Sequence, residues 1–323
     1  MGSRINLIAL LVPFLLAPLS AASQTFPAKP LRIISIFGVG SVAESSMRLL
    51  GQRMTQSLGQ PVVVETQAGA GGVIGGQRVA RSAPDGYTLL FTELVQQLVA
   101  PMLVKEKPFD PLKDLEPITN ALEGGICLIA GTATPFNTIK EFIDYSKRNP
   151  GKLSYGSGGV GALNHLQMEL LKAQLGLDII HVPYKGGTAS MTDVIANQIP
   201  LGFVAIGAAM PNLRSGKLKI IGIVDTRRHA LAPELAVIGE EVPGFEKIPG
   251  GLMLYGPAGM PRPIFNRLHA EFVKQLTSEE YRNEVRKFFF VPIANSPQEA
   301  AQQQKEAMTL IVKALKTAGI VPE

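Results

Sequence analysis

Short apolar runs alternate with glycine-rich stretches and amphipathic segments over the first hundred residues. Residues 31–37, 62–65 and 87–91 are apolar and rich in β-branched side chains, which predicts strands. Residues 43–58 and 73–81 carry apolar side chains at helical spacing, which predicts helices between those strands. This strand–helix order predicts a parallel sheet with helices on both faces.

The same rhythm restarts after a proline-rich connection at residues 107–117. The predicted elements are an extended stretch at 118–131, a helix at 139–148, a strand at 153–155, a helix at 163–175, and strands at 179–184, 199–206 and 218–224. An amphipathic helix at 263–276 follows, and a second runs from the N-cap Ser296 to Thr317. We therefore predict an α/β protein of two lobes joined by crossing strands, with a ligand cleft between them. Residues 24–124 and 225–323 are assigned to lobe 1, and residues 125–224 to lobe 2.

The N-terminus has the order of a secretory signal. Arg4 precedes an apolar run at residues 5–19, and small residues follow at 20–23. The run is shorter than the ~20 residues that span a bilayer. We predict a cleaved signal peptide at residues 1–23 and a periplasmic location.

Composition and motifs argue against several function classes. The formal net charge is +5 with scattered basic residues, and the aromatic content is 6%, so no nucleic-acid partner is expected. Cys127 is the single cysteine and lies in an apolar run, which favours a buried thiol. Ile74 stands where a dinucleotide fingerprint needs glycine, and the four histidines lack metal-binding spacing. We expect no cofactor, no metal and no catalysis. Ser157 could be a nucleophile or a hydroxyl that binds a ligand, so a hydrolase or transferase remains an alternative.

Glycine-rich loops stand between a strand and a helix at residues 38–41, 69–72, 156–161 and 186–187. Glycine lets the backbone approach a ligand closely, and the following helix N-terminus offers unpaired N–H groups and about half a positive charge. Together these features favour a carboxylate or a phosphate. Open α/β sheets bind ligands at this edge, so the loops predict an anion site.

Several segments in order along the chain resemble one family. They read FPAKPLRII at 26–34, LGQPVVVE at 58–65, APDGYTLL at 83–90, PGKLSY at 150–155, HVPYKGG at 181–187 and PAGMP at 257–261. This combination is similar to the Bug-type extracytoplasmic solute receptors of tripartite tricarboxylate transporters. The resemblance implies a type II periplasmic-binding fold, a small carboxylate ligand and delivery to membrane permease subunits. It also implies that the loop after the first strand holds the ligand carboxylate.

The chain departs from the family pattern in the expected pocket. The first loop usually reads Pro-Gly-Gly-x-Thr-Asp in the family, whereas residues 39–44 read VGSVAE and have lost the threonine hydroxyl. A Phe-Asp-Asn-like run is replaced by Phe203 followed by Val204, Ala205 and Ile206. Apolar side chains there favour a ligand with a hydrophobic body, such as an aromatic acid. Glu44 and Glu93 either point to solvent or pair with a ligand amine.

The predicted ligand-binding residues come from both lobes. They are Val39, Gly40, Ser41, Val42, Ala43, Glu44, Thr92, Glu93, Gln96, Ser157, Gly158, Gly159, His165, Lys185, Val204, Ala205 and Ile206. His165 is expected to pack beneath its loop. We predict a monomer that captures a small organic acid for a tripartite transporter; a sensor that reports to a membrane signalling partner is the alternative.

Overall fold

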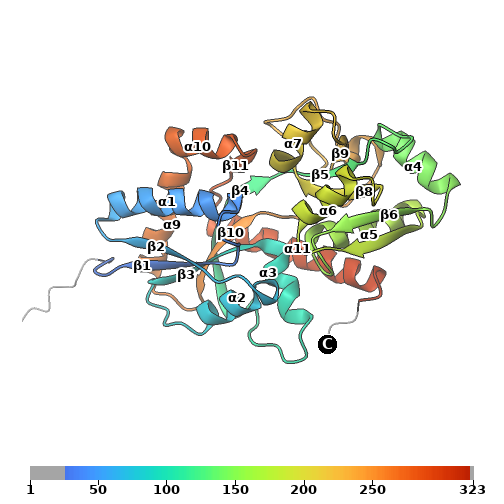
Figure 1. Ribbon diagram of the computed structural model, residues 1–323. Helices are drawn as coiled ribbons and strands as arrows, with labels where there is room; N and C mark the ends of the chain where they lie inside the picture. The colour runs from blue at the N-terminus through green and yellow to red at the C-terminus, as the bar shows by residue number, and fades with distance from the viewer. Residues whose placement is uncertain (1–25, 321–323) are drawn as a thin grey trace, which may run out of the picture.

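The protein is described by a computed structural model of residues 26–320, and it consists of two lobes side by side (Figure 1). A six-stranded sheet of order β11-β4-β10-β3-β1-β2 forms the first lobe, and a five-stranded sheet of order β7-β6-β8-β5-β9 forms the second. The predicted signal peptide lies outside the described residues. The first sheet consists of β1 (Leu31–Ser35), β2 (Val62–Thr66), β3 (Thr88–Glu93), β4 (Leu115–Gly124), β10 (Leu252–Pro257) and β11 (Phe290–Pro292). The second consists of β5 (Ile126–Ala130), β6 (Leu153–Ser157), β7 (Ile179–Pro183), β8 (Leu201–Ala205) and β9 (Lys219–Ile223).

The first lobe begins with the predicted parallel unit. β1 pairs in parallel with β2 and β3, and β10 then pairs antiparallel with β3 and β4, so the complete sheet is mixed. Leu31 and Ile33 of β1 pack with Met47 and Leu50 of α1 in one core, which explains the apolar spacing of that helix. The helices that follow these strands are α1 (Val42–Leu58), η1 (Ala70–Gly72), α2 (Val73–Ala80), α3 (Leu94–Val99) and η2 (Ala100–Met102).

The second lobe repeats the same spatial order of strands, with β7-β6-β8 in the place of β2-β1-β3 and β5 in the place of β10. β6 pairs in parallel with β7 and β8, whereas β5 pairs antiparallel with β8 and β9. Cys127 of β5 is fully buried and donates to the carbonyl of Val204, which confirms the predicted core thiol. The helices of this part are α4 (Ile139–Arg148), α5 (Leu163–Leu175), α6 (Gly187–Ile195), α7 (Ile206–Arg214) and α8 (Ile238–Glu241).

Two chain crossings join the lobes. The first runs from β4 to β5 through Gly125, so the predicted extended stretch at 118–131 is divided into two strands there. A side chain at Gly125 would overlap Ile206. The second lies between α8 and β10. Because Ile238 and Phe245 pack into a core of the second sheet, we propose residue 246, rather than residue 225, as the point of return to lobe 1.

The C-terminal helices are α9 (Arg262–Leu276), α10 (Glu279–Arg286) and α11 (Pro297–Thr317). Ser296 and Glu299 form the capping box that the sequence predicts at the start of α11. This helix lies across both lobes, because Ile311 packs in one core with Leu166 of α5 and Leu98 of α3 (Figure 1). Within residues 26–320, no helix has both the length and the apolar character needed to cross a membrane.

Candidate ligand-binding cleft

Two cavities lie between the lobes and meet at Glu93 and Leu163. The inner chamber, of about 210 Å³, borders the two crossings at Gly124, Gly125 and Lys247. The outer chamber, of about 600 Å³, lies between α3 and η2 of the first lobe and the loops before α5 and α6 of the second. Pockets for small ligands commonly enclose ~300–1,000 Å³, so the two chambers together suit a small organic molecule.

Two helix N-termini face the outer chamber without a side-chain cap. α5 begins after Ala162 and α6 after Gly186, and neither of these residues provides a capping side chain. Ala162 and Gly186 border the chamber, as does the exposed Lys185. Unpaired N–H groups and the positive ends of two helix dipoles therefore adjoin one space, which suits a carboxylate.

Glu93 occupies the junction of the two chambers. It ends β3 and caps α3, because its carboxylate accepts from Val95 N at 3.2 Å and from Gln96 N at 2.7 Å. Burial raises the pKa of Glu93 to about 7, against the opposing effect of these two backbone hydrogen bonds. The side chain is half-buried, so it does not simply point to solvent. The α3 N-terminus is thus filled by the protein's own carboxylate.

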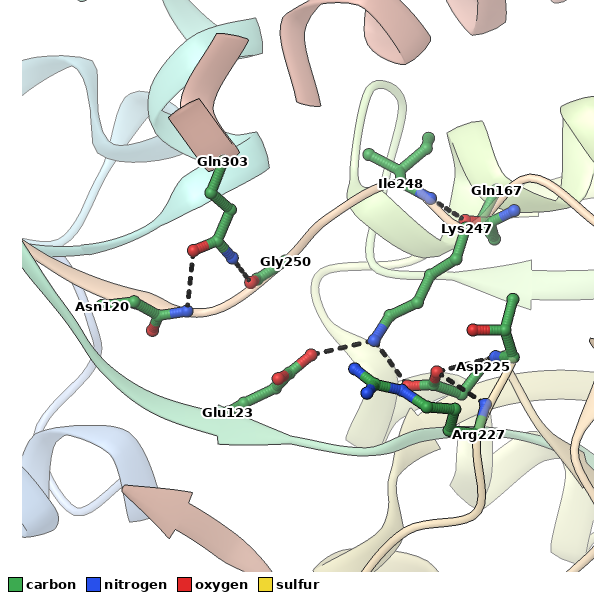
Figure 2. A network of polar contacts seen from close by, with 10 residues as sticks. Asn120, Glu123, Gln167, Asp225, Arg227, Lys247, Ile248, Gly250 and Gln303 are labelled. Carbon is green, nitrogen blue, oxygen red and sulfur yellow. Dashed lines mark hydrogen bonds and ion pairs between the residues drawn. The ribbon is translucent and has the colours of Figure 1, made fainter. Parts of the chain in front are cut away.

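A polar network fixes the crossing segments beside the inner chamber (Figure 2). Lys247 lies between Glu123 at the end of β4, at 2.9 Å, and Asp225 directly after β9. Although burial opposes its charge, the two carboxylates raise the pKa of Lys247, so the lysine is protonated. Gln167 of α5 accepts from Ile248 N at 2.7 Å. The two crossings are therefore joined by ion pairs and by an amide hydrogen bond, and no local sequence pattern indicates these contacts.

Comparisons with known proteins identify the family. Residues 46–319 match the model of the tripartite tricarboxylate transporter family receptor. The chain is a member of this receptor family. It is 35% identical to a UPF0065 protein of Bordetella pertussis, over 83% of this chain and 81% of that protein. A solved structure of a protein from R. palustris with adipate has 25% identity and a TM-score of 0.81, over 92% of this chain and all of that one. The periplasmic binding protein BugD has 28% identity and a TM-score of 0.76, over 92% of this chain and 100% of that one. The predicted family and two-lobed fold are confirmed.

In this receptor, none of the predicted residues from Val39 to Glu44 borders either chamber. Ser41 caps α1 by accepting from Glu44 N at 3.2 Å, and the Glu44 carboxylate accepts from Gly40 N at 3.3 Å. Glu44 is 2% exposed and pairs with Arg48, so the interpretation that it points to solvent is wrong. The first loop is closed on itself by a carboxylate of the chain.

Buried polar side chains support the glycine loop after β6. Ser157 is 0% exposed, and its Oγ lies 2.6 Å from His181 Nε2, while His165 Nδ1 accepts from Gly161 N at 3.1 Å. Burial lowers the pKa of both histidines, that of His181 to about 4, so both rings are neutral. Ser157 therefore supports the loop through these buried contacts. Gly159 donates to Ser157 Oγ at 3.1 Å as part of the same support.

The remaining predicted residues divide between the chambers and the core. Gln96, Gly158 and Lys185 border the outer chamber, and Ala205 borders the inner one. Thr92 is fully buried. Val204 and Ile206 pack into a core of the second lobe, because β8 passes directly into α7 at this point, so they do not form the predicted apolar wall. The apolar wall of the inner chamber comes instead from Ile126, Leu163, Val224, Ile248, Leu252 and Phe290. Among residues 26–320, no cluster of His, Cys, Asp and Glu is suited to a metal ion.

Proposed function

We propose that this receptor captures a small organic carboxylate in the periplasm and delivers it to the permease subunits of a tripartite tricarboxylate-type transporter. The observation that carries the proposal is the outer chamber, where the N-termini of α5 and α6 and the cation of Lys185 adjoin one cavity. The adipate in the R. palustris relative supports the same ligand class. We further propose that the receptor acts as a monomer.

We also propose that the ligand carries an apolar body, such as an alkyl chain or an aromatic ring. The support comes from the inner chamber, which is lined by Leu163, Leu252 and Phe290 and shares Glu93 and Leu163 with the outer chamber. Apolar walls favour apolar ligand groups, because polar groups without partners lose hydration there.

Titration calorimetry of purified protein tests the ligand class. Hexanoate and benzoate should bind, whereas malate and citrate should bind at least about tenfold more weakly, because their extra polar groups meet apolar walls. Exclusive binding of malate or citrate would contradict the apolar body. Failure of every carboxylate to bind would contradict the proposed function itself.

Two separate lysine substitutions test the role of the cation at the outer chamber. Lys185→Gln removes the cation at the outer chamber and should weaken hexanoate binding by about fivefold to tenfold. Lys152→Gln removes an exposed cation elsewhere in the same lobe and should leave affinity unchanged. Equal affinities for the two variants would remove Lys185 from the site.

Co-purification with a permease supports transport, and co-purification with a membrane sensor instead would contradict it.

A further inference from the structure

The two chambers differ in the charge that they offer a ligand. The outer chamber is bordered by open helix N-termini and Lys185, and by one carboxylate, that of Glu93 at the junction with the inner chamber. The inner chamber is bordered by three carboxylates, those of Glu93, Glu123 and Asp225, and by one cation, Lys247. The cleft is therefore polarised along its length, and a ligand that fills both chambers meets opposite charges at its two ends.

Lys247 is not free to receive a ligand anion. Its ammonium lies between Glu123 and Asp225 beside the two crossings, so its positive charge is already paired with two carboxylates (Figure 2). Among the described residues that line the inner chamber, it is the sole cation. A second ligand carboxylate that entered this chamber would thus find no unpaired cation and would lie near three carboxyl groups of the chain, those of Glu93, Glu123 and Asp225.

Glu93 can still accept hydrogen bonds. When ionised, the carboxylate has about four lone-pair positions, and the α3 amides of Val95 and Gln96 use two of them. A nearby ammonium favours this ionised form over the protonated form that burial favours. The carboxylate borders both chambers, and one of its oxygens lies 3.9 Å from the position that a Cβ on Gly250 would take, at the inner chamber wall. An acceptor with open positions therefore stands at the junction, inward of the proposed carboxylate site in the outer chamber.

We infer that Glu93 selects ligands with a protonated nitrogen at the end opposite the carboxylate. The substrate class is then a carboxylate joined through an apolar linker to an amine, such as an ω-amino acid, rather than a dicarboxylate. This inference rests on the proposed function, since it requires the ligand carboxylate to sit in the outer chamber. Ammonium–carboxylate hydrogen bonds are stronger than neutral ones, and partial burial strengthens them further.

Three acids of equal chain length separate the possibilities by calorimetry. With 6-aminohexanoate, hexanoate and adipate, the amino acid should bind at least about tenfold more tightly than hexanoate, and adipate more weakly than either. Adipate binding as tightly as 6-aminohexanoate would overturn the inference while leaving the carboxylate receptor intact. Absence of binding by all three would count against the proposed function instead.

Substitution of Glu93 assigns the preference to this side chain. Glu93→Gln keeps an oxygen that can cap α3 and should remove the advantage of 6-aminohexanoate over hexanoate. Glu234→Gln alters an exposed carboxylate away from the cleft and should behave as the unaltered protein does.

Should Glu93→Gln fold poorly, Glu123→Gln gives an independent measurement. It relieves Lys247 of one partner and should strengthen adipate and weaken 6-aminohexanoate. Retention of the amine preference in both variants would overturn the inference.

Discussion

The two lobes are built from the same strand–loop–helix unit, but their helix N-termini are used differently. In the first lobe, the Glu44 carboxylate closes the loop before α1, and the Glu93 carboxylate caps α3. In the second lobe, α5 and α6 begin after Ala162 and Gly186 without a capping side chain and border the outer chamber. A helix N-terminus that the chain itself has filled cannot hold a ligand anion. One acidic residue can thus occupy a helix N-terminus that would otherwise be open to a ligand anion.

The largest expected effect comes from filling a helix N-terminus of the second lobe in the same way. Ala162 has the extended backbone conformation of an N-cap, so Ala162→Asp should cap α5 and place a carboxylate in the outer chamber. Hexanoate affinity should fall by about thirtyfold or more through competition and repulsion, while stability rises by about 0.5–2 kcal/mol.

Ala162→Asn is the matched control for that change. It supplies a similar cap without the charge, so it should raise stability comparably and weaken binding much less. Calorimetry and thermal unfolding of both variants give the comparison. Equal hexanoate affinity in Ala162→Asp and the unaltered protein would show that the ligand carboxylate lies elsewhere.

An intermediate effect is expected from opening the first loop. Glu44→Gln removes a buried charge that pairs with Arg48 and accepts from Gly40 N. The free energy of unfolding should fall by about 1–3 kcal/mol, because Arg48 and the loop amide lose a charged partner. Hexanoate affinity should change less than about threefold, since the loop borders neither chamber. A large loss of affinity with unchanged stability would restore the first loop as a ligand contact.

The smallest expected effect is a pH dependence of stability that Glu93 introduces. Its pKa rises from 4.5 to about 7 on folding because of burial, so the folded state keeps a proton that the unfolded chain has lost between those values. Stability should therefore decrease as the pH rises through this interval. The difference in Tm between the unaltered protein and Glu93→Gln should shift by roughly a few degrees across it. A constant difference would contradict the buried carboxylate.

Much of the fold follows from local pattern. The apolar spacing of α1, the capping box of α11 and the glycine loops all lie where the sequence predicts them, because each is set by neighbouring residues. The crossings between the lobes are predicted less well from local sequence pattern. The stretch at 118–131 divides at Gly125, whose carbonyl accepts from Ile206 N at 2.9 Å, and Ile206 is far along the chain. The return point also depends on the fold, because the burial of Phe245 depends on the second sheet.

The site could be predicted only in part. Residue type identifies glycine loops, but it does not show which helix N-termini the chain fills by itself, and that decides the role of Glu44 and Glu93. The family pattern predicts Val204 and Ile206 in the cleft, although the end of β8 and the start of α7 place them in a core of the second lobe. Lys247 gives no signal in sequence, because Glu123 and Asp225 reach it only through the fold.

A crystal structure of the complex with hexanoate tests the central claim most directly. The account predicts the ligand carboxylate at the N-termini of α5 and α6, beside Ala162 and Gly186, with the alkyl chain directed past Glu93 toward the inner chamber. A carboxylate bound instead at the loop before α1, with Glu44 displaced from Gly40 N, would contradict it.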